Sequence, residues 1–242
     1  MNKIDTNNLP KHIGIIMDGN GRWAKTKGKL RLFGHKSGVK AVRETVEMSA
    51  QIGIKFLTLY AFSTENWSRP KSEVKSLMRL LISSINRETK TLLKNNIKLK
   101  SIGDTNLLPQ DAKEQLNSSI EKTKNNNRMT LILALSYSGR WDIISAVKKI
   151  IKHKITSDKI DEQLFEQYLS TKNVPNPELL IRTSGEFRIS NFLLWQSAYS
   201  EFYFTETLWP DFRKSDLEKA IIDFQSRERR FGNTVEQKNQ AC

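Results

Sequence analysis

Cysteine and long apolar runs are the first things that this sequence lacks. Its single cysteine is Cys242, the last residue, so one chain can form neither a disulfide nor a thiolate metal site. No apolar run approaches the roughly 18–20 residues that a transmembrane helix needs. The first residues, Met1–Pro10, are polar and lack the apolar stretch of a signal peptide. We therefore expect a cytoplasmic protein.

Nucleotide-binding motifs and repeats are also missing. No Gly-x-x-x-x-Gly-Lys-Ser/Thr string occurs, which excludes a P-loop kinase. The chain has no internal repeat, no low-complexity tract and no Gly/Ser linker. A length of 242 residues therefore predicts one domain over 1–242, with flexible tails at 1–10 and 233–242.

Negative charge is in short supply. The chain has 40 Lys and Arg residues against 26 Asp and Glu residues, which gives a net charge of +14. Basic surfaces attract nucleic acid, anionic lipid headgroups or phosphorylated substrates. Most of the lysines are scattered, however, and an ordinary solvated surface explains them equally well. A nucleic-acid-binding protein is an alternative that rests on this charge alone.

Short apolar runs alternate with amphipathic segments along the chain. Such runs are typical of strands buried on both faces, and they are His12–Met17, Phe56–Phe62, Ile97–Ile102, Met129–Ser136 and Leu179–Arg182. The segments between them predict helices, four of which are Gly34–Ile52, Pro109–Lys124, Arg140–His153 and Leu217–Glu228. Gly53 is placed to end the first of these helices, and Ser215 with Glu218 predicts a capping box for the last. The alternation predicts an α/β fold with a mostly parallel sheet covered by helices on both faces.

Polar side chains gather where the predicted strands end. Asp18 to Arg22, Ser63 to Arg69 and Arg182 to Ser190 each follow a strand, as do Gly103-Asp104 and Ser136 to Arg140. Because ligands of open parallel sheets bind beyond the carboxyl ends of the strands, we expect these segments to converge on one site. Their backbone N–H groups, arginines and hydroxyls suit two diphosphates, and Asp18 suits Mg²⁺.

Each segment also has a simpler interpretation. The first could be a plain Gly-rich turn, the second a surface loop with a packed Trp, and the third a solvated charged turn. Glu201 stands in an aromatic run, where an unpaired carboxylate is costly, but on an edge strand it could face solvent.

Five strings in order decide among these alternatives. They are His12–Trp23 (HIGIIMDGNGRW), Gly34–Gly38 (GHKSG), Phe62–Pro70 (FSTENWSRP), Arg182–Trp195 (RTSGEFRISNFLLW) and Glu201–Pro210 (EFYFTETLWP). With them the chain resembles the cis-prenyltransferase (isoprenyl transferase) family from about Pro10 to Gly232. The Asp-Asp-x-x-Asp string of the helical trans-prenyltransferases does not occur.

The resemblance implies an activity and a set of site residues. The activity is sequential addition of isopentenyl diphosphate to an allylic diphosphate such as farnesyl diphosphate. The product would be a long-chain Z-polyprenyl diphosphate such as undecaprenyl diphosphate, which is the lipid carrier precursor for cell-wall polysaccharides. Asp18 and Asn66 are implied as catalytic, with Asn66 near the proton-loss step, where a weakly basic carboxamide would position or relay. The implied substrate-binding residues are Gly19, Asn20, Gly21, Arg22, Trp23, Arg31, His35, Ser63, Thr64, Glu65, Trp67, Arg69, Arg182, Arg188, Ile189 and Ser190.

The resemblance further implies a metal, a partner copy and a tunnel. Asp18 and Glu201 would hold Mg²⁺, which reverses the solvent-facing interpretation of Glu201. An apolar tunnel for the growing chain would lie between the sheet and helices at Gly38–Ile52 and Ser72–Leu93. The family forms homodimers, in which Arg230 to Gly232 would help to complete the neighbouring site, and we expect transient association with the inner membrane face.

Two departures from the family pattern concern the strand end before Arg140 and the segment after Arg182. The family often has Asn-Tyr-Gly-Gly-Arg where this chain has Ser136-Tyr-Ser138-Gly-Arg, and Arg-Thr-Gly-Gly where it has Arg182-Thr-Ser-Gly. An inactive partner subunit of a prenyltransferase is a further alternative, but it predicts loss of Asp18, Asn66 or the arginine pair, and all are present.

Overall fold

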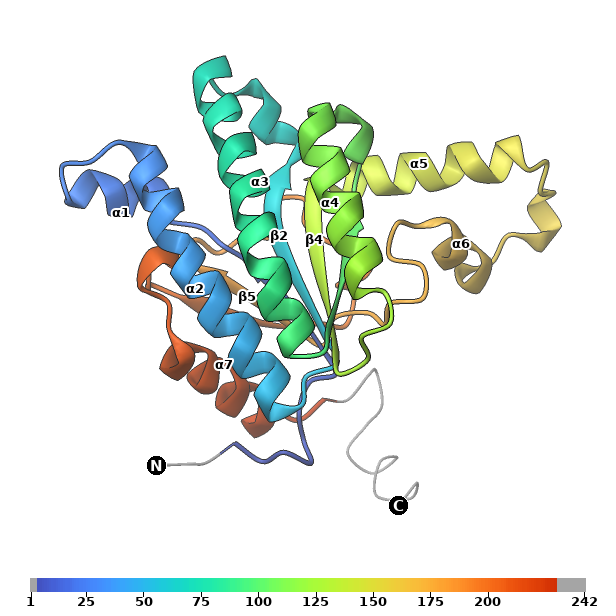
Figure 1. Ribbon diagram of the computed structural model, residues 1–242. Helices are drawn as coiled ribbons and strands as arrows, with labels where there is room; N and C mark the ends of the chain where they lie inside the picture. Colours follow the sequence, from blue (N-terminus) through green and yellow to red (C-terminus); the bar gives the residue numbers. More distant parts are fainter. Residues whose placement is uncertain (1–3, 230–242) are drawn as a thin grey trace.

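A six-stranded sheet lies at the centre of the protein, whose computed structural model describes residues 4–229 (Figure 1). The strand order is β3-β4-β2-β1-β5-β6, and every pair is parallel. The strands are β1 (His12–Ile16), β2 (Phe56–Ser63), β3 (Ile97–Ile102), β4 (Met129–Tyr137), β5 (Leu179–Thr183) and β6 (Glu201–Thr205). The α/β fold with a parallel sheet is therefore confirmed.

The five predicted strands form where their apolar runs lie. All residues of β1 and β5 are buried, as the continuous runs predict for strands covered on both faces. The sixth strand, β6, was not among them. It is half-exposed along its whole length at the edge of the sheet, so its residues do not form a buried run.

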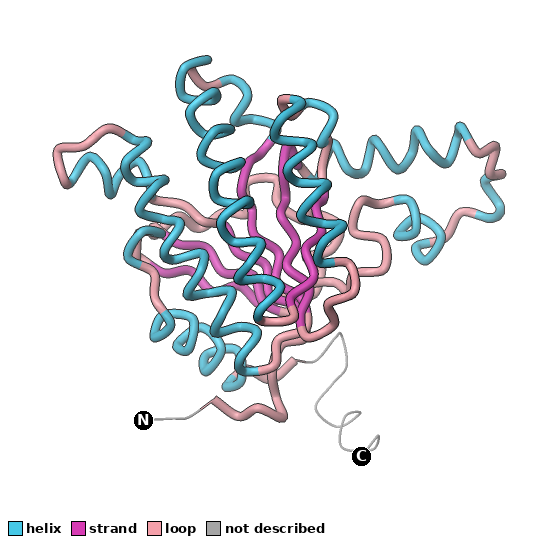
Figure 2. Tube along the Cα trace, viewed as in Figure 1, coloured by secondary structure: helices cyan, strands magenta, loops and turns pink. Residues whose placement is uncertain are grey.

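Four helices cover one face of the sheet (Figures 1 and 2). They are α2 (Arg31–Ile52), α3 (Lys71–Lys94), α4 (Gln110–Thr123) and α7 (Lys214–Ser226). Their apolar faces share the main hydrophobic core with the strands. Gly53 ends α2 with a φ of 109°, as predicted. The predicted capping box of α7 was wrong: Arg213 precedes the helix, and its N–H donates to Asp216 Oδ2 at 3.0 Å.

The second face is covered mainly by irregular chain rather than by helices. The side chains of Phe192 and Leu193 are fully buried there, in a second core with Ile16 and Leu180 of the sheet. The helices α5 (Gly139–Lys152) and α6 (Glu162–Tyr168) project to one side of the molecule around a small core of their own (Figure 1). The sequence predicted helices on both faces because it gave no sign of this long irregular cover.

The ends of the described chain lie close together. Gln225 of α7 donates to the carbonyl groups of Asp5 and Asn8, at 2.7 and 2.9 Å. The region expected as a tail at 1–10 is thus hydrogen-bonded to α7 over part of its length, whereas 233–242 lies outside the described residues. Within residues 4–229, none of the helices combines the length and the apolar character that crossing a membrane requires.

Candidate active site

The central position of β1 decides which segments meet. Its neighbours are β2 and β5, with Ile16 opposite both Tyr60 and Arg182. Because all three strands run in the same direction, the segments that follow them lie at one edge of the sheet. Asp18, the loop after Ser63 and the end of β5 therefore come together, although they are far apart in the sequence.

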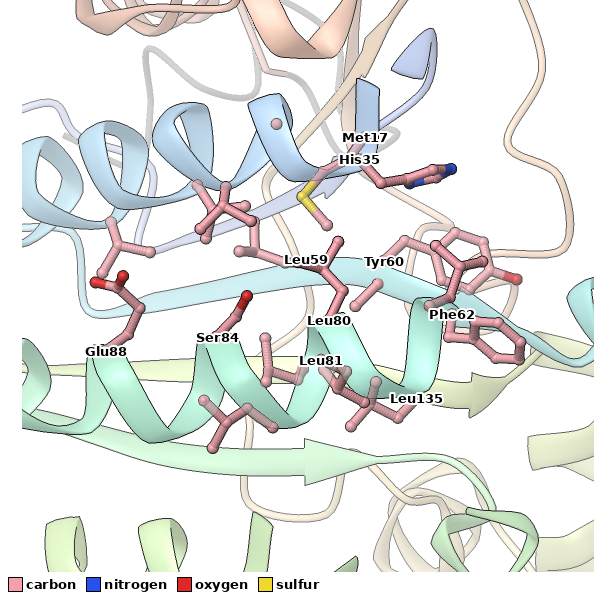
Figure 3. A pocket seen from close by; sticks show the side chains of 18 of the residues that line it. Met17, His35, Leu59, Tyr60, Phe62, Leu80, Leu81, Ser84, Glu88 and Leu135 are labelled. Atoms are coloured by element: carbon pink, nitrogen blue, oxygen red, sulfur yellow. The ribbon is translucent and has the colours of Figure 1, made fainter. Parts of the chain in front are cut away.

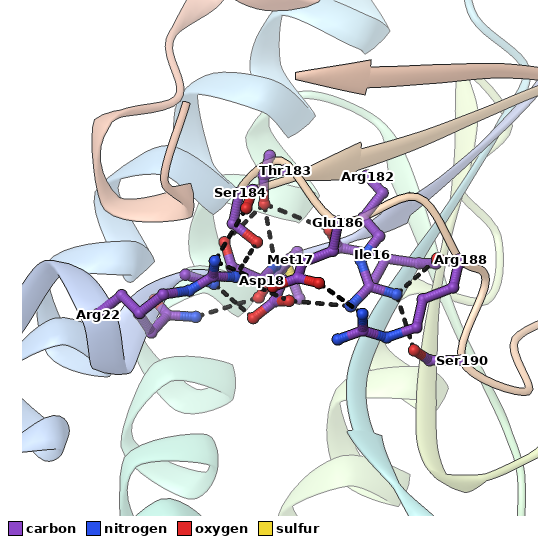
Figure 4. A network of polar contacts seen from close by, with 12 residues as sticks. Ile16, Met17, Asp18, Arg22, Arg182, Thr183, Ser184, Glu186, Arg188 and Ser190 are labelled. Atoms are coloured by element: carbon purple, nitrogen blue, oxygen red, sulfur yellow. Dashed lines mark hydrogen bonds and ion pairs between the residues drawn. The ribbon is translucent and has the colours of Figure 1, made fainter. Parts of the chain in front are cut away.

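Asp18 is the centre of the polar network at this edge (Figure 4). Its Oδ2 accepts from Arg182 Nη2 at 2.9 Å and from Arg22 Nη2 at 3.3 Å, and its Oδ1 accepts from the Gly19 N–H at 2.6 Å. Burial acts to raise the pKa of Asp18, but the hydrogen bonds from Arg182 and Gly19 outweigh it and lower the pKa. Asp18 is therefore ionised at neutral pH, with 36% of its side chain exposed.

Arg182 is fixed from several sides. Only 4% of it is exposed, and its Nη1 donates to Ser190 Oγ at 2.7 Å and to the carbonyl oxygen of Arg188 at 2.5 Å. The Arg188 side chain is 60% exposed and pairs with Glu186, which also lies 3.1 Å from Arg22 Nη1. The structure thus brings Arg182, Arg188 and Ser190 together.

A short 3-10 helix, Thr64–Ser68, follows β2 and carries the second predicted segment. Asn66 Oδ1 accepts from the Ser63 N–H at 3.2 Å, which fixes the carboxamide. Glu65 accepts from Asn191 Nδ2 at 2.8 Å. Burial acts to raise the pKa of Glu65, and the hydrogen bond from Asn191 outweighs it and lowers the pKa. Thr64 Oγ1 donates to Glu65 Oε2 at 3.1 Å.

The two serines of the first departure from the family pattern, Ser136 and Ser138, have structural roles. Trp67 Nε1 donates to Ser136 Oγ, which ties the 3-10 helix to the end of β4. Ser138 caps α5, where its Oγ accepts from the Trp141 N–H at 3.3 Å. Both serines are buried beside the site and point to their own chain rather than into solvent.

These side chains surround a polar pocket of about 590 Å³. Its lining residues are Ile16, Met17, Asp18, Tyr60, Ser63, Glu65, Asn66, Arg69, Arg140, Arg182, Ser190, Asn191 and Leu194. Of the polar residues among them, Tyr60, Arg140 and Asn191 were not named as site residues. Arg140 ends the segment Ser136 to Arg140, which was expected at this site. Asn191 lies one residue beyond an expected segment and Tyr60 lies within a buried strand, so neither was indicated.

The beginning of α1 (Asn20–Thr26) forms the other part of the site. Gly19 precedes this helix with a φ of 104°, a conformation that favours glycine, and a Cβ there would lie 2.9 Å from Leu208 Cδ2. The first N–H groups of a helix have no acceptor within the helix and suit an anion. Trp23 lines neither the polar pocket nor the apolar cavity described below. Its Nε1 instead donates to Asp211 Oδ2 at 2.7 Å.

Arg31, His35 and Arg69 lie close together at the beginnings of α2 and α3. Glu73 joins the two arginines, at 3.6 Å from Arg31 Nε and 3.2 Å from Arg69 Nη1. Burial, together with the positive charges of Arg69 and Arg31, lowers the pKa of His35 to about 4. His35 is therefore neutral at physiological pH and can donate or accept a hydrogen bond. Ile189 packs against the second core.

An elongated apolar cavity of about 260 Å³ continues from the polar pocket (Figure 3). It lies between α2, α3 and the sheet, where apolar side chains such as Val42, Leu59, Leu81 and Leu133 line it. His35 is near one end and Glu88 near the other. Four residues line both the cavity and the pocket, namely Met17, Tyr60, Asn66 and Arg69.

Glu201 was predicted to hold Mg²⁺ together with Asp18, and the structure does not bring these two residues of one chain together. Glu201 begins β6 and lies opposite Leu179, the first residue of β5, whereas Asp18 lies beyond the partner of Arg182. Because the strands are parallel, the two carboxylates are at opposite ends of the sheet. Glu201 Oε2 instead accepts from Arg227 Nη1 at 2.9 Å. Over residues 4–229, no cluster of three or more His, Cys, Asp and Glu side chains could hold a metal.

Comparison with known proteins agrees with this geometry. A family model described as putative undecaprenyl diphosphate synthase matches residues 16–232. The chain belongs to this prenyltransferase family. One relative is an isoprenyl transferase of Chlorobaculum tepidum, which is 56% identical over 95% of this chain and 88% of the relative. Another is a ditrans,polycis-undecaprenyl-diphosphate synthase ((2E,6E)-farnesyl-diphosphate specific) of Pasteurella multocida, which is 51% identical over 98% of this chain and 100% of the relative.

Solved structures of prenyltransferases show the same fold. Lavandulyl diphosphate synthase from Lavandula x intermedia, in complex with dimethylallyl diphosphate, has a TM-score of 0.90 at 39% identity and covers 93% of this chain and 99% of its own. A probable undecaprenyl diphosphate synthase from Campylobacter jejuni has a TM-score of 0.79 at 35% identity and covers 96% and 100%. The element Arg230 to Gly232 lies outside the described residues.

Proposed function

We propose that this prenyltransferase adds isopentenyl diphosphate units to an allylic diphosphate, with farnesyl diphosphate as primer, and releases a long-chain Z-polyprenyl diphosphate such as undecaprenyl diphosphate. One observation carries the proposal. A polar pocket with arginines opens into an elongated apolar cavity, and four residues line both. A diphosphate head and a growing hydrocarbon tail need these two environments side by side. Relatives 50 and 51% identical to the chain are named as synthases of this kind.

Two sets of residues would bind the two diphosphates. The backbone of Gly19–Arg22 with Arg31, His35 and Arg69 would bind the allylic diphosphate, whose tail then enters the apolar cavity lined by His35 and Arg69. Arg182, Arg188 and Ser190 would bind isopentenyl diphosphate in the polar pocket. Glu186 forms ion pairs with Arg22 and Arg188, and a bound diphosphate would replace this carboxylate as their partner.

Asp18 stands between the two sets and would hold Mg²⁺. An ionised, partly exposed carboxylate facing a pocket fits a cation that usually takes one or two carboxylates and completes its shell with water and phosphate oxygens. Bound Mg²⁺ would supply positive charge to the leaving diphosphate. Arg182 and Arg22, which both contact Asp18, hold its carboxylate in place.

The reaction then needs one bond broken, one formed and one proton lost. The allylic carbon–oxygen bond breaks as the diphosphate leaves, and guanidinium groups neutralise the charge that develops on it. The terminal carbon of the isopentenyl double bond forms the new carbon–carbon bond, which leaves a carbocation on its neighbour. The methylene between this carbocation and the CH₂–O carbon then gives a proton to the released diphosphate, which sets a cis alkene. Asn66 lines both cavities, with its carboxamide oxygen held by Ser63, and would orient the reacting ends rather than accept the proton itself.

The growing chain would extend along α3 in the apolar cavity. The cavity is lined from Leu77 to Leu92 of this helix, which is about 22 Å at a rise of about 1.5 Å per residue. The proposed tunnel therefore runs between the sheet and the helices α2 and α3. Its walls would set the length of the product.

A second copy of the chain would cover the exposed apolar stripe of α5. Ile144, Val147 and Ile151 are 53, 40 and 70% exposed and share one helix face. The helix projects away from the sheet, where a second copy can reach it (Figure 1). Exposed apolar stripes of this kind mark interaction surfaces, which supports a homodimer.

Product analysis tests the proposed function directly. The purified chain is incubated with farnesyl diphosphate, radiolabelled isopentenyl diphosphate and a range of Mg²⁺ concentrations, and the butanol-extractable products are sized by chromatography. We expect Mg²⁺-dependent lipid products that contain several added units. Absence of a lipid product at every Mg²⁺ concentration would overturn the proposal.

A further inference from the structure

Positive charge is concentrated in one segment beside the active site. Between Gly19 and Arg43 the chain has eight Lys and Arg residues and no Asp or Glu. Three of the lysines, Lys25, Lys27 and Lys29, surround the turn between α1 and α2, and all three are exposed. Part of the positive net charge of the chain is therefore concentrated in this segment, although the lysines elsewhere are scattered.

Two large apolar side chains are exposed in the same turn. Leu30 is 84% exposed and Phe33 is 43% exposed, whereas most apolar side chains of α2 face the core. The turn itself projects from the body of the protein (Figures 1 and 2). Gly28 has a φ of 62°, and a Cβ added there would meet nothing within 4 Å. We call Lys25–Phe33 the basic-apolar turn.

Ring contacts hold the basic-apolar turn in shape. Trp23 stacks on Phe33 with ring centroids 5.8 Å apart and an interplanar angle of 19°. Lys27 Nζ lies 5.8 Å from the centroid of Trp23. The lysines and the apolar side chains are therefore presented together on a packed platform.

The platform is fixed to the active site. A Cβ at Gly34 would lie 1.9 Å from the carbonyl oxygen of Asn20, so α1 and α2 pack in direct backbone contact. Arg31, within the turn, lies 3.6 Å from Glu73 at the beginning of α3. The basic-apolar turn is thus next to the mouth of the apolar cavity, which His35 lines.

We infer that the basic-apolar turn docks the protein on the surface of an anionic bilayer. Lysines near such a surface are attracted to its acidic headgroups, and neighbouring apolar side chains enter the interface. Leu30 favours a bilayer over a nucleic acid, because an aliphatic side chain cannot stack on bases as aromatic side chains do. This inference rests on the proposed function, because docking would let a lipid product leave the cavity beside the membrane that receives it.

Vesicle co-sedimentation of the full chain tests this surface without catalysis. We expect binding to phosphatidylglycerol-containing vesicles, weak binding to pure phosphatidylcholine and release at high salt. Replacing Lys25, Lys27 and Lys29 by Gln lowers the partition coefficient on the order of 100-fold, at about tenfold for every one to two lysines. Leu30→Ser lowers it roughly five- to tenfold through lost apolar contact.

Matched variants on another surface separate docking from general charge. Three exposed lysines far from the turn serve as controls, namely Lys90 and Lys94 in the last part of α3 and Lys122 in the last part of α4. The apolar control is Leu107, which is 54% exposed. The triple Gln variant of these lysines and Leu107→Ser should bind vesicles almost as the parent does. Equal losses in both sets, no loss in the first set, or binding to a short RNA in place of vesicles would each overturn the inference.

Activity in detergent keeps the two proposals apart. All variants should make product at the parental rate in detergent micelles, since none of the replaced residues lies in the proposed substrate sites. Vesicle binding without product in the parent would overturn the proposed function and leave the docking surface standing. Product formation without vesicle binding would overturn the docking surface and leave the proposed function standing.

Discussion

Arg182 Nη2 lies 2.9 Å from Asp18 Oδ2, across 164 positions of the sequence. The contact exists because β1 and β5 are neighbours and run in parallel, so that their ends coincide. It joins the carboxylate proposed to hold the metal to an arginine proposed to bind isopentenyl diphosphate. A shared pocket for two diphosphates depends on this juxtaposition.

Asp18→Ala tests the role of the carboxylate. We expect turnover to fall at least about 10²–10³-fold, since the charge on the leaving diphosphate loses its proposed metal. The fold should remain, because Asp18 is partly exposed. Steady-state rates over a range of Mg²⁺ concentrations, with circular dichroism as the control for folding, measure both effects. Near-normal turnover would remove Asp18 from the mechanism.

The two diphosphate sites should respond separately to loss of an arginine. Arg188→Gln is expected to raise KM for isopentenyl diphosphate roughly tenfold or more, through the loss of a charge-assisted contact. Arg31→Gln should raise KM for the allylic diphosphate instead, because it lies beside Arg69 and Glu73 on the other side of the site. Initial rates with one substrate varied at a time give both constants. Equal effects of both variants on both constants would contradict two separate sites.

The ends of the central strands could be predicted from the sequence. The register of the edge strand β6 and the first residue of α7 could not. Continuous apolar runs located β1 and β5, so the parallel rule placed Asp18 and Arg182 together. The position of Glu201 could not be inferred, because resemblance gives a residue a role without giving the register of its strand. Arg213, not Ser215, precedes α7, since packing of the helix rather than local pattern decides where it begins.

Some site residues could not be predicted because they belong to the irregular cover of the second face. Asn191 has a φ of 63° and binds Glu65 through its side chain and Arg140 through its Oδ1, at 2.8 and 3.0 Å. No period of 2 or 3.6 residues describes such a segment, so its path cannot be inferred from pattern. Only the folded chain shows that it closes the pocket.

Stability should decrease as the pH falls from about 6.5 to about 4. Burial lowers the pKa of His12 from 6.5 to about 4, and the residue is 1% exposed. Between these values the unfolded chain binds the proton and the folded chain does not, so acid favours unfolding. The loss from His12 approaches about 3 kcal/mol at the acid end of the window. Urea unfolding at several pH values measures it.

His12→Gln supplies the control for this pH dependence. Gln can replace one of the hydrogen bonds that the ring makes to Thr58 Oγ1 and to the carbonyl oxygen of Pro175. The variant should be less stable at neutral pH, yet its stability should change less between about pH 6.5 and 4, since one titrating group is gone. A slope unchanged from the parent would show that His12 does not carry the effect.

The apolar stripe of α5 should control the oligomeric state. Ile144→Glu and Ile151→Glu place charges on the face proposed to meet a second copy, and we expect monomers in place of dimers. Light scattering coupled to gel filtration gives the mass. Leu107→Glu, at a position of similar exposure on another surface, is the matched control and should leave the dimer intact. A monomeric parent protein would also contradict the prediction.

Ser84→Phe should shorten the product. Ser84 lies on α3 between Leu77 and Leu92, lines the apolar cavity, and points into it (Figure 3). Its Oγ is buried without a hydrogen-bond partner among the described residues, so the side chain can be replaced without breaking a contact that holds the helix. A phenyl ring at this position would fill the far half of the cavity. We expect the product distribution to shift to shorter chains, with the rate of the first addition nearly unchanged.

Ser83→Phe is the matched control, because Ser83 is the neighbouring residue on α3 but faces solvent. The same ring there leaves the cavity open, so products of parental length are expected. Chromatographic sizing of radiolabelled products from both variants, with the first addition measured separately at limiting isopentenyl diphosphate, distinguishes blockage from misfolding. If Ser84→Phe made products of parental length, the growing chain would have to take another path, since the ring and the hydrocarbon cannot occupy the same space beside α3.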